Sequence, residues 1–127
     1  MNQVNHLNSV SVEGTLVRDP VFRTTPKGTP LCKFLLASKR FLEEEGTHEV
    51  SFFLIETRHK KVEDCNNNGR EGRHVRVVGR LKQDRWMDAD GMKLSKVFIE
   101  AEHVEFRPEF DKYLANKQED ANAGDDD

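Results

Sequence analysis

The 127-residue sequence contains only two cysteines, one tryptophan and one tyrosine, and it has no apolar run near the ~18 residues that a membrane helix needs. Residues 1–6 lack the basic start and the apolar stretch of a signal peptide, so we expect a cytoplasmic protein that does not contact membranes. Cys32 and Cys65 lie far apart in the chain. In a reducing compartment they are expected to be free thiols.

Patterns for metal sites and catalysis are also missing. The five histidines never come closer than eleven residues, which fits no zinc spacing. Residues 88–91 (Asp-Ala-Asp-Gly) resemble part of a calcium-binding loop, but its first and twelfth positions would be Trp86 and Val97, which cannot bind the ion. We interpret this segment as a hairpin turn. No phosphate-binding loop or nucleophile motif occurs, so the sequence predicts no metal, no cofactor and no enzymatic activity.

Charge is unevenly distributed along the chain. Residues 111–127 hold six acidic and two basic side chains, and the formal net charge of the whole chain is −3. Residues 1–110 therefore carry about one net positive charge and are predicted to form one folded domain, followed by a disordered acidic tail over residues 111–127. A nearly neutral domain can still present a basic stripe to a polyanion.

Short segments with alternating apolar and polar residues, separated by turn signals, predict an all-β fold. Gly14 interrupts the apolar face of the first segment, as expected where a strand bends strongly. Residues 21–23 form a short extension between two turns, residues 41–48 are expected to be a charged loop, and residues 58–66 are predicted to form a short helix between the third and fourth strands. The five predicted strands span residues 10–16, 31–39, 50–55, 74–87 and 92–104.

Alternation also predicts which side chains face the core. In the second strand Cys32, Phe34 and Leu36 are expected to point inward, and Lys33 and Lys39 outward. The third strand is almost entirely apolar, which indicates burial on both faces. In the helix His59 and Val62 are expected to face inward. In the fourth strand the residues predicted to face the core are Val75, Val77, Gly79 and Leu81.

The opposite face of the fourth strand has a different chemistry, because Arg76, Arg80, Lys82 and Trp86 share it. Lysine and arginine bind backbone phosphates, and a flat ring stacks on bases of any identity. The pattern is therefore typical of a protein that binds single strands without reading their sequence. Spacing alone leaves an equal alternative, in which the cations merely solvate an exposed strand and the ring caps a core edge.

Residues 8–23, 26–28 and 34–38, with residues 71–81, 85–86 and 90–91, together resemble the bacterial single-stranded DNA-binding protein family over about residues 8–104. The resemblance implies a five-stranded barrel of the oligonucleotide/oligosaccharide-binding (OB) type. It also implies sequence-independent binding of single-stranded DNA in replication, recombination and repair. By the same resemblance we expect a homo-oligomer, with dimer and tetramer both open, and replication and repair proteins as partners of the acidic tail.

The resemblance transfers functional roles only where residues match. Trp86 takes the place of a base-stacking tryptophan, and Phe41 lies close to another stacking aromatic. Val50 and Glu56 stand where the family commonly has a Trp and a Phe, which implies a thinner aromatic platform. The complete set of residues expected to bind nucleic acid is Trp86, Phe41, Arg23, Lys33, Lys39, Arg80, Lys82 and Arg85.

Two other functions remain open at this point. The chain could be an accessory factor like primosomal replication protein N, which resembles the family in fold but uses fewer aromatics and often forms only dimers. It could also be an OB subunit that binds protein and no longer binds DNA. Binding of oligo-dT that weakens steeply with salt would support DNA binding over the second alternative.

Overall fold

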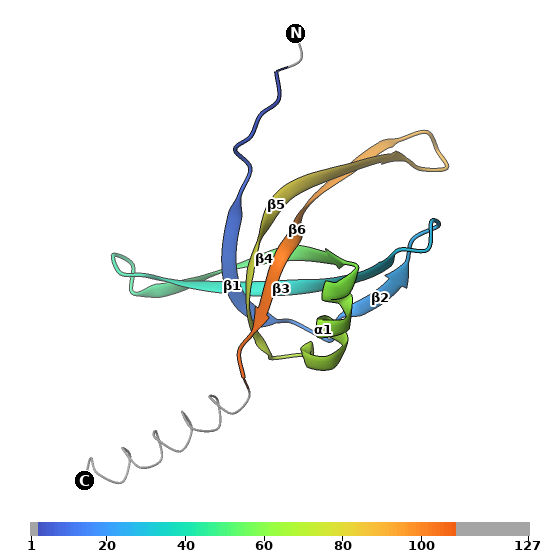
Figure 1. Ribbon diagram of the computed structural model, residues 1–127. Coiled ribbons are helices and arrows are strands. Elements are labelled where there is room, and N and C mark those ends of the chain that lie inside the picture. Colours follow the sequence, from blue (N-terminus) through green and yellow to red (C-terminus); the bar gives the residue numbers. More distant parts are fainter. Residues whose placement is uncertain (1–2, 109–127) are drawn as a thin grey trace, which may run out of the picture.

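A computed structural model describes residues 3–108 of the chain, so the predicted acidic tail lies outside the described residues. Five strands of the described part close into an OB-like barrel, with the order β1-β5-β6-β4-β3 and a return from β3 to β1 (Figure 1). The predicted mainly β fold with a closed five-stranded barrel is confirmed. The elements are β1 (Val10–Leu16), β2 (Val21–Thr24), β3 (Pro30–Leu42), β4 (Thr47–Arg58), α1 (Lys60–Asn68), β5 (His74–Met87) and β6 (Lys93–Phe106).

The core lies inside the barrel and is built from one side-chain face of each barrel strand. Cys32, Phe34 and Leu36 are buried on β3, as their alternation predicts. Val75 and Val77 are buried on β5 in the same way. The buried cluster as a whole consists of Leu16, Cys32, Phe34, Leu36, Ile55, Cys65, Val75, Val77, Ile99 and Ala101.

Two glycines allow the barrel strands to approach closely. A Cβ on Gly14 would collide with the backbone carbonyl oxygen of Ala37, beside the point where β1 turns from β5 to pair with β3. A Cβ on Gly79 would collide with the carbonyl oxygen of Glu100, at the bulge in the β5–β6 ladder. Glycine is therefore required at both positions because a side chain would fill space that backbone already occupies.

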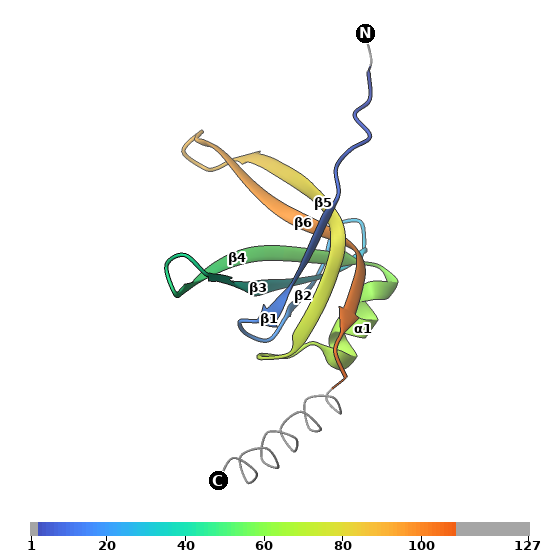
Figure 2. The same cartoon turned by 90° about the vertical axis from the view of Figure 1, so that its left-hand side faces the viewer.

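Beyond the barrel, β3–β4 and β5–β6 continue as two-stranded arms. The β3–β4 ladder runs out to the pair Leu42–Thr47, and the β5–β6 ladder to the pair Met87–Lys93. The two hairpins pair directly through a short parallel contact between β4 and β6, at Ile55–Ile99 and Glu56–Glu100, and β1 joins β3 to β5 on the other side. Figure 2 shows both arms leaving the barrel toward the same side and separating from each other.

The arms correct three sequence predictions. Residues 41–48 do not form a long loop, because β3 extends to Leu42 and β4 begins at Thr47. Residues 50–55 are not covered on both faces, since Phe52 exposes 59% of its surface. Leu81 is not a core residue, since it exposes 50%. The last two errors have the same cause: an arm outside the barrel has no second layer to bury its apolar side chains.

The helix α1 spans Lys60–Asn68, against the predicted 58–66, and packs through Cys65 and Val62 onto the core. His59 is exposed just before the helix, with a φ of 61°, so the prediction that it faces inward is wrong. Cys32 and Cys65 are both free and buried, and the Cys65 sulfur lies 3.7 Å from Oγ1 of Thr57. The neighbouring Cys65 thiol and burial both raise the pKa of Cys32, which disfavours its reactive thiolate.

Candidate nucleic-acid interface

The face of the sheet that points away from the barrel core, which we call the outer face, gathers most of the predicted site residues. Side chains of residues paired across strands project to the same face. Lys33 pairs with Glu56, Glu56 with Glu100, and Glu100 with Arg80. A single row of charged side chains therefore crosses β3, β4, β6 and β5 at the point where the two arms diverge.

The other predicted cations occupy the same face at different positions. Lys39 follows Lys33 on β3 with the same parity and is exposed. Arg23 lies on the adjoining strand β2, where it pairs with Leu31 of β3. Burial lowers the pKa of Lys33, the hydrogen bond with Lys96 lowers it further, and the positive charge of Arg23 makes a smaller contribution in the same direction. Lys82 lies one step beyond Arg80 on β5.

Two carboxylates hold several of these cations in ion pairs. The Glu100 carboxylate lies 3.2 Å from the Arg80 guanidinium and 3.2 Å from the Lys82 ammonium. Glu56 is only 2% exposed and lies 3.2 Å from the Lys96 ammonium. Burial raises the pKa of Glu100, but hydrogen bonds from Lys82 and Arg80 outweigh it and hold this pKa below its ordinary value.

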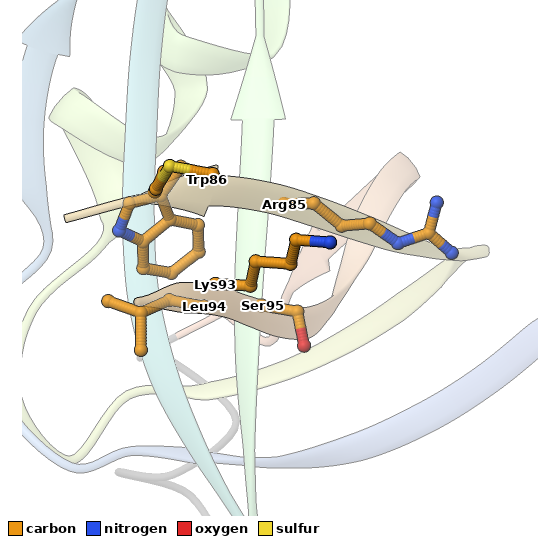
Figure 3. A pocket seen from close by; sticks show the side chains of 6 residues that line it. Arg85, Trp86, Lys93, Leu94 and Ser95 are labelled. Atoms are coloured by element: carbon orange, nitrogen blue, oxygen red, sulfur yellow. The ribbon is translucent and has the colours of Figure 1, made fainter. Parts of the chain in front are cut away.

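Trp86 lies on the outer face of the β5–β6 arm, where its cross-strand partner is Leu94. Its ring is 47% exposed and borders an open pocket of about 470 Å³ lined by this arm alone (Figure 3). A half-exposed ring with an apolar neighbour can stack on a planar ligand with little rearrangement. The lining residues are Arg85, Trp86, Met87, Lys93, Leu94 and Ser95.

Arg85 is the one predicted site residue that the structure does not bring to the outer face. Its guanidinium points away from the Trp86 ring in Figure 3, and it donates a 2.8 Å hydrogen bond to Gln83. This placement follows from alternation, because neighbouring residues of a strand project to opposite faces. A contact from Arg85 would reach a bound strand only around the edge of the arm.

The β3–β4 arm carries its own aromatic side chains. Phe41 exposes 53% of its surface, and its ring centroid lies 5.1 Å from that of His48, its cross-strand partner. Phe52 lies on the same face, opposite Ala37. The sequence analysis did not identify Phe52 as a site residue. The signal that could have identified it is its spacing: Phe52 is two residues from Val50 and four from Glu56, so it shares a strand face with these two positions, where the family commonly has aromatic residues.

The turn of the β5–β6 arm is held by Asp88. Its carboxylate accepts hydrogen bonds of 2.9 Å from the backbone N–H groups of Asp90 and Met92, and Gly91 adopts a φ of 79°. The predicted hairpin turn is therefore confirmed. Within residues 3–108, no helix has the length and apolar character needed to cross a membrane.

A closed OB-like barrel whose outer face combines exposed rings with lysine and arginine side chains defines a small nucleic-acid-binding module. The model of the single-strand binding protein family matches residues 7–107, and the chain belongs to this family.

Several curated bacterial proteins are similar to the chain. A single-stranded DNA-binding protein of Aquifex aeolicus is 37% identical, covering 90% of this chain and 80% of that protein. The single-stranded DNA-binding protein of Caldanaerobacter subterraneus is 35% identical, over 79% and 67% respectively. That of Helicobacter hepaticus is 32% identical, over 92% and 72%. The resemblance inferred from motifs is thereby confirmed.

Proposed function

We propose that the protein binds single-stranded DNA without reading its sequence, by contacts of lysine and arginine with phosphates and by stacking of bases on the rings of the two arms. The observation that carries the proposal is the shared outer face, which places Trp86, Phe41 and most of the predicted cations on one side of the sheet. Family membership supports the same function. The family consists of binding proteins, so no catalytic role is proposed.

Phe52 adds a ring to a platform that looks thin in the sequence. Along one strand, residues of equal parity lie about 7 Å apart, close to the spacing between bases of an extended single strand. Phe52 and Val50 occupy successive outward positions on β4, and the Phe41–His48 pair lies one step further along the arm. We propose that these rings replace the stacking groups expected at Val50 and Glu56.

Truncation of Trp86 tests the proposed site. Stacking contributes about 1–3 kcal/mol per base, so Trp86→Ala should weaken binding of a fluorescein-labelled oligo-dT about 5- to 150-fold, measured by anisotropy. The melting temperature should change little, because the ring is half exposed. Val97→Ala is the matched control, because Val97 is exposed on the opposite face of the same arm and is not among the residues that line this pocket.

Two results would contradict this site assignment. A sharp fall in melting temperature with unchanged affinity per folded molecule would make Trp86 a structural residue. An equal loss of affinity in Val97→Ala would show that the arm as a whole, and not the ring, determines binding. Failure of the unaltered protein to bind oligo-dT at low salt would favour the OB subunit that binds protein.

The accessory factor resembling primosomal replication protein N remains the second candidate, because Val50 and Glu56 reduce the aromatic platform. The exposed Trp86 on a long β5–β6 arm favours the first candidate. We further propose that the protein acts in the bacterial cytoplasm as a homo-oligomer, in replication, recombination and repair. Its acidic tail would then be the contact for replication and repair proteins.

A further inference from the structure

Each of two glutamates on the outer face lies between two cations. Glu100 is 3.2 Å from both the Arg80 guanidinium and the Lys82 ammonium. Glu56 is 3.2 Å from the Lys96 ammonium and is the cross-strand partner of Lys33. These two carboxylates are themselves paired across β4 and β6, so they lie side by side where the arms diverge.

The carboxylates are more enclosed than the cations around them. The Glu56 side chain is 2% exposed and that of Glu100 is 20% exposed, whereas Lys82 and Arg80 expose 38% and 51%. A DNA strand on this face would therefore meet the cations first. The positive charge of these cations would already be partly neutralised, because the two carboxylates are shared among four cations: Arg80, Lys82, Lys96 and Lys33.

We infer that Glu56 and Glu100 act as internal competitors of the DNA phosphates, each reducing the number of cations on the outer face that a strand can neutralise. The inference rests on the proposed function. A phosphate that contacts Lys82 or Arg80 must weaken the contact of that cation with Glu100, so part of the Coulomb energy gained from DNA is lost inside the protein. The protein thereby binds DNA more weakly, and with a shallower salt dependence, than its count of lysines and arginines predicts.

Salt dependence measures this effect directly. For single strands, log K falls with log salt by about 0.7 for each phosphate neutralised. Removing the charge of one carboxylate exposes about one further positive charge to the strand, so the slope should become steeper by about 0.7. The opposite role, in which the carboxylates orient the cations for DNA, predicts a weaker and less salt-dependent complex when a carboxylate is lost.

Glu100→Gln is the informative change, because the amide keeps the size and one acceptor oxygen of the carboxylate. We expect tighter binding of oligo-dT at low salt, and an affinity ratio between variant and unaltered protein that grows about fivefold for each tenfold fall in salt concentration. Glu56 is a poorer choice for substitution, because its burial makes unfolding a competing explanation.

Glu63→Gln provides the matched control. Its loss changes the net charge by the same amount, but Glu63 is exposed on α1 and not on the outer face. The slope of Glu63→Gln should stay within about 0.2 of the unaltered protein. Light scattering and thermal melting of every variant exclude changes of assembly or folding.

A second measurement introduces Lys82→Gln into the unaltered protein and into the Glu100→Gln protein. If Glu100 competes with phosphate, Lys82→Gln should lower affinity more in the Glu100→Gln protein than in the unaltered one. If Glu100→Gln leaves affinity and slope unchanged, or weakens binding while the protein stays folded, the inference is wrong although the proposed function stands. If the unaltered protein does not bind oligo-dT at any salt concentration, the proposed function and the inference are both wrong.

Discussion

Phe52 exposes 59% of its surface on the outer face of β4, while Phe53 beside it faces Leu36 of the core-forming face and exposes 38%. The two phenylalanines thus lie on opposite faces of β4, and both are exposed to solvent. Only Phe52 shares its face with Phe41 and Lys39, where an exposed ring is suited to stacking on a bound strand.

Phe52→Ala should therefore weaken oligo-dT binding by about fivefold or more, with a small change in melting temperature. Phe53→Ala, on the opposite face of the same strand, should leave the affinity of the folded protein nearly unchanged. Fluorescence anisotropy and thermal melting of both variants measure the contrast. Equal affinities for Phe52→Ala and the unaltered protein would remove Phe52 from the platform.

At the scale of single residues, the alternation of apolar and polar residues predicted correctly which face of a strand a side chain occupies. It did not predict whether that face is buried. It placed Trp86, Lys82 and Arg80 on one face of a strand, as found. It could not show that Leu81 leaves the core, because an apolar residue has the same place in the pattern whether or not a second layer lies over it.

At the scale of elements, the meeting of β1 and β3 depends on Gly14. Its missing side chain leaves room for the backbone carbonyl of Ala37, and a methyl group there would force the two strands apart. Gly14→Ala should lower the free energy of unfolding by about 1–3 kcal/mol, measured by urea denaturation. Ser11→Ala, at an exposed position of the same strand, should change it by less than about 0.5 kcal/mol. A fully stable Gly14→Ala protein would show that the barrel closes without this contact.

The same scale shows why the strands of the barrel and the β5–β6 arm could be predicted, whereas the outer part of the β3–β4 arm could not. Residues 10–16, 31–39 and 74–79 alternate because one face packs on the core. Residues 41–48 carry charges on every side and gave no such signal, yet their backbones pair as far as Leu42 and Thr47. Pairing of an exposed arm is determined by backbone hydrogen bonds and the turn, which leave little trace in hydropathy.

At the scale of the whole molecule, the closed order of strands was accessible only through the resemblance. The parallel contact of β4 with β6 involves two residue pairs between segments about forty residues apart, and no local pattern encodes such a contact. The outer face depends on this contact, because it joins the cations of β3 to those of β5. The composition of the site was thus predictable from the strands, while its assembly required the fold.

The edge of β1 leads to a prediction about assembly. Residues 10–15 pair with β5 on one side, but only Thr15 and Leu16 pair with β3 on the other, so within the described residues the second edge of Val10–Glu13 has no strand beside it. An open edge with a half-buried apolar face favours pairing with another strand, and a second copy of β1 offers the same edge. Light scattering at tens of micromolar should therefore give at least twice the 14.7 kDa of one chain.

Ser11→Glu tests whether this edge forms the contact. Ser11 and Glu13 are both exposed on one face of β1, so the substitution would bring four carboxylates near a two-fold axis between paired copies. We expect the variant to dissociate to monomers at concentrations where the unaltered protein is dimeric, and to re-associate partly as salt screens the repulsion. The control is Glu63→Asp on α1, which keeps the charge and lies far from the edge. A monomeric unaltered protein, or a Ser11→Glu protein that stays fully dimeric at low salt, would exclude pairing through β1.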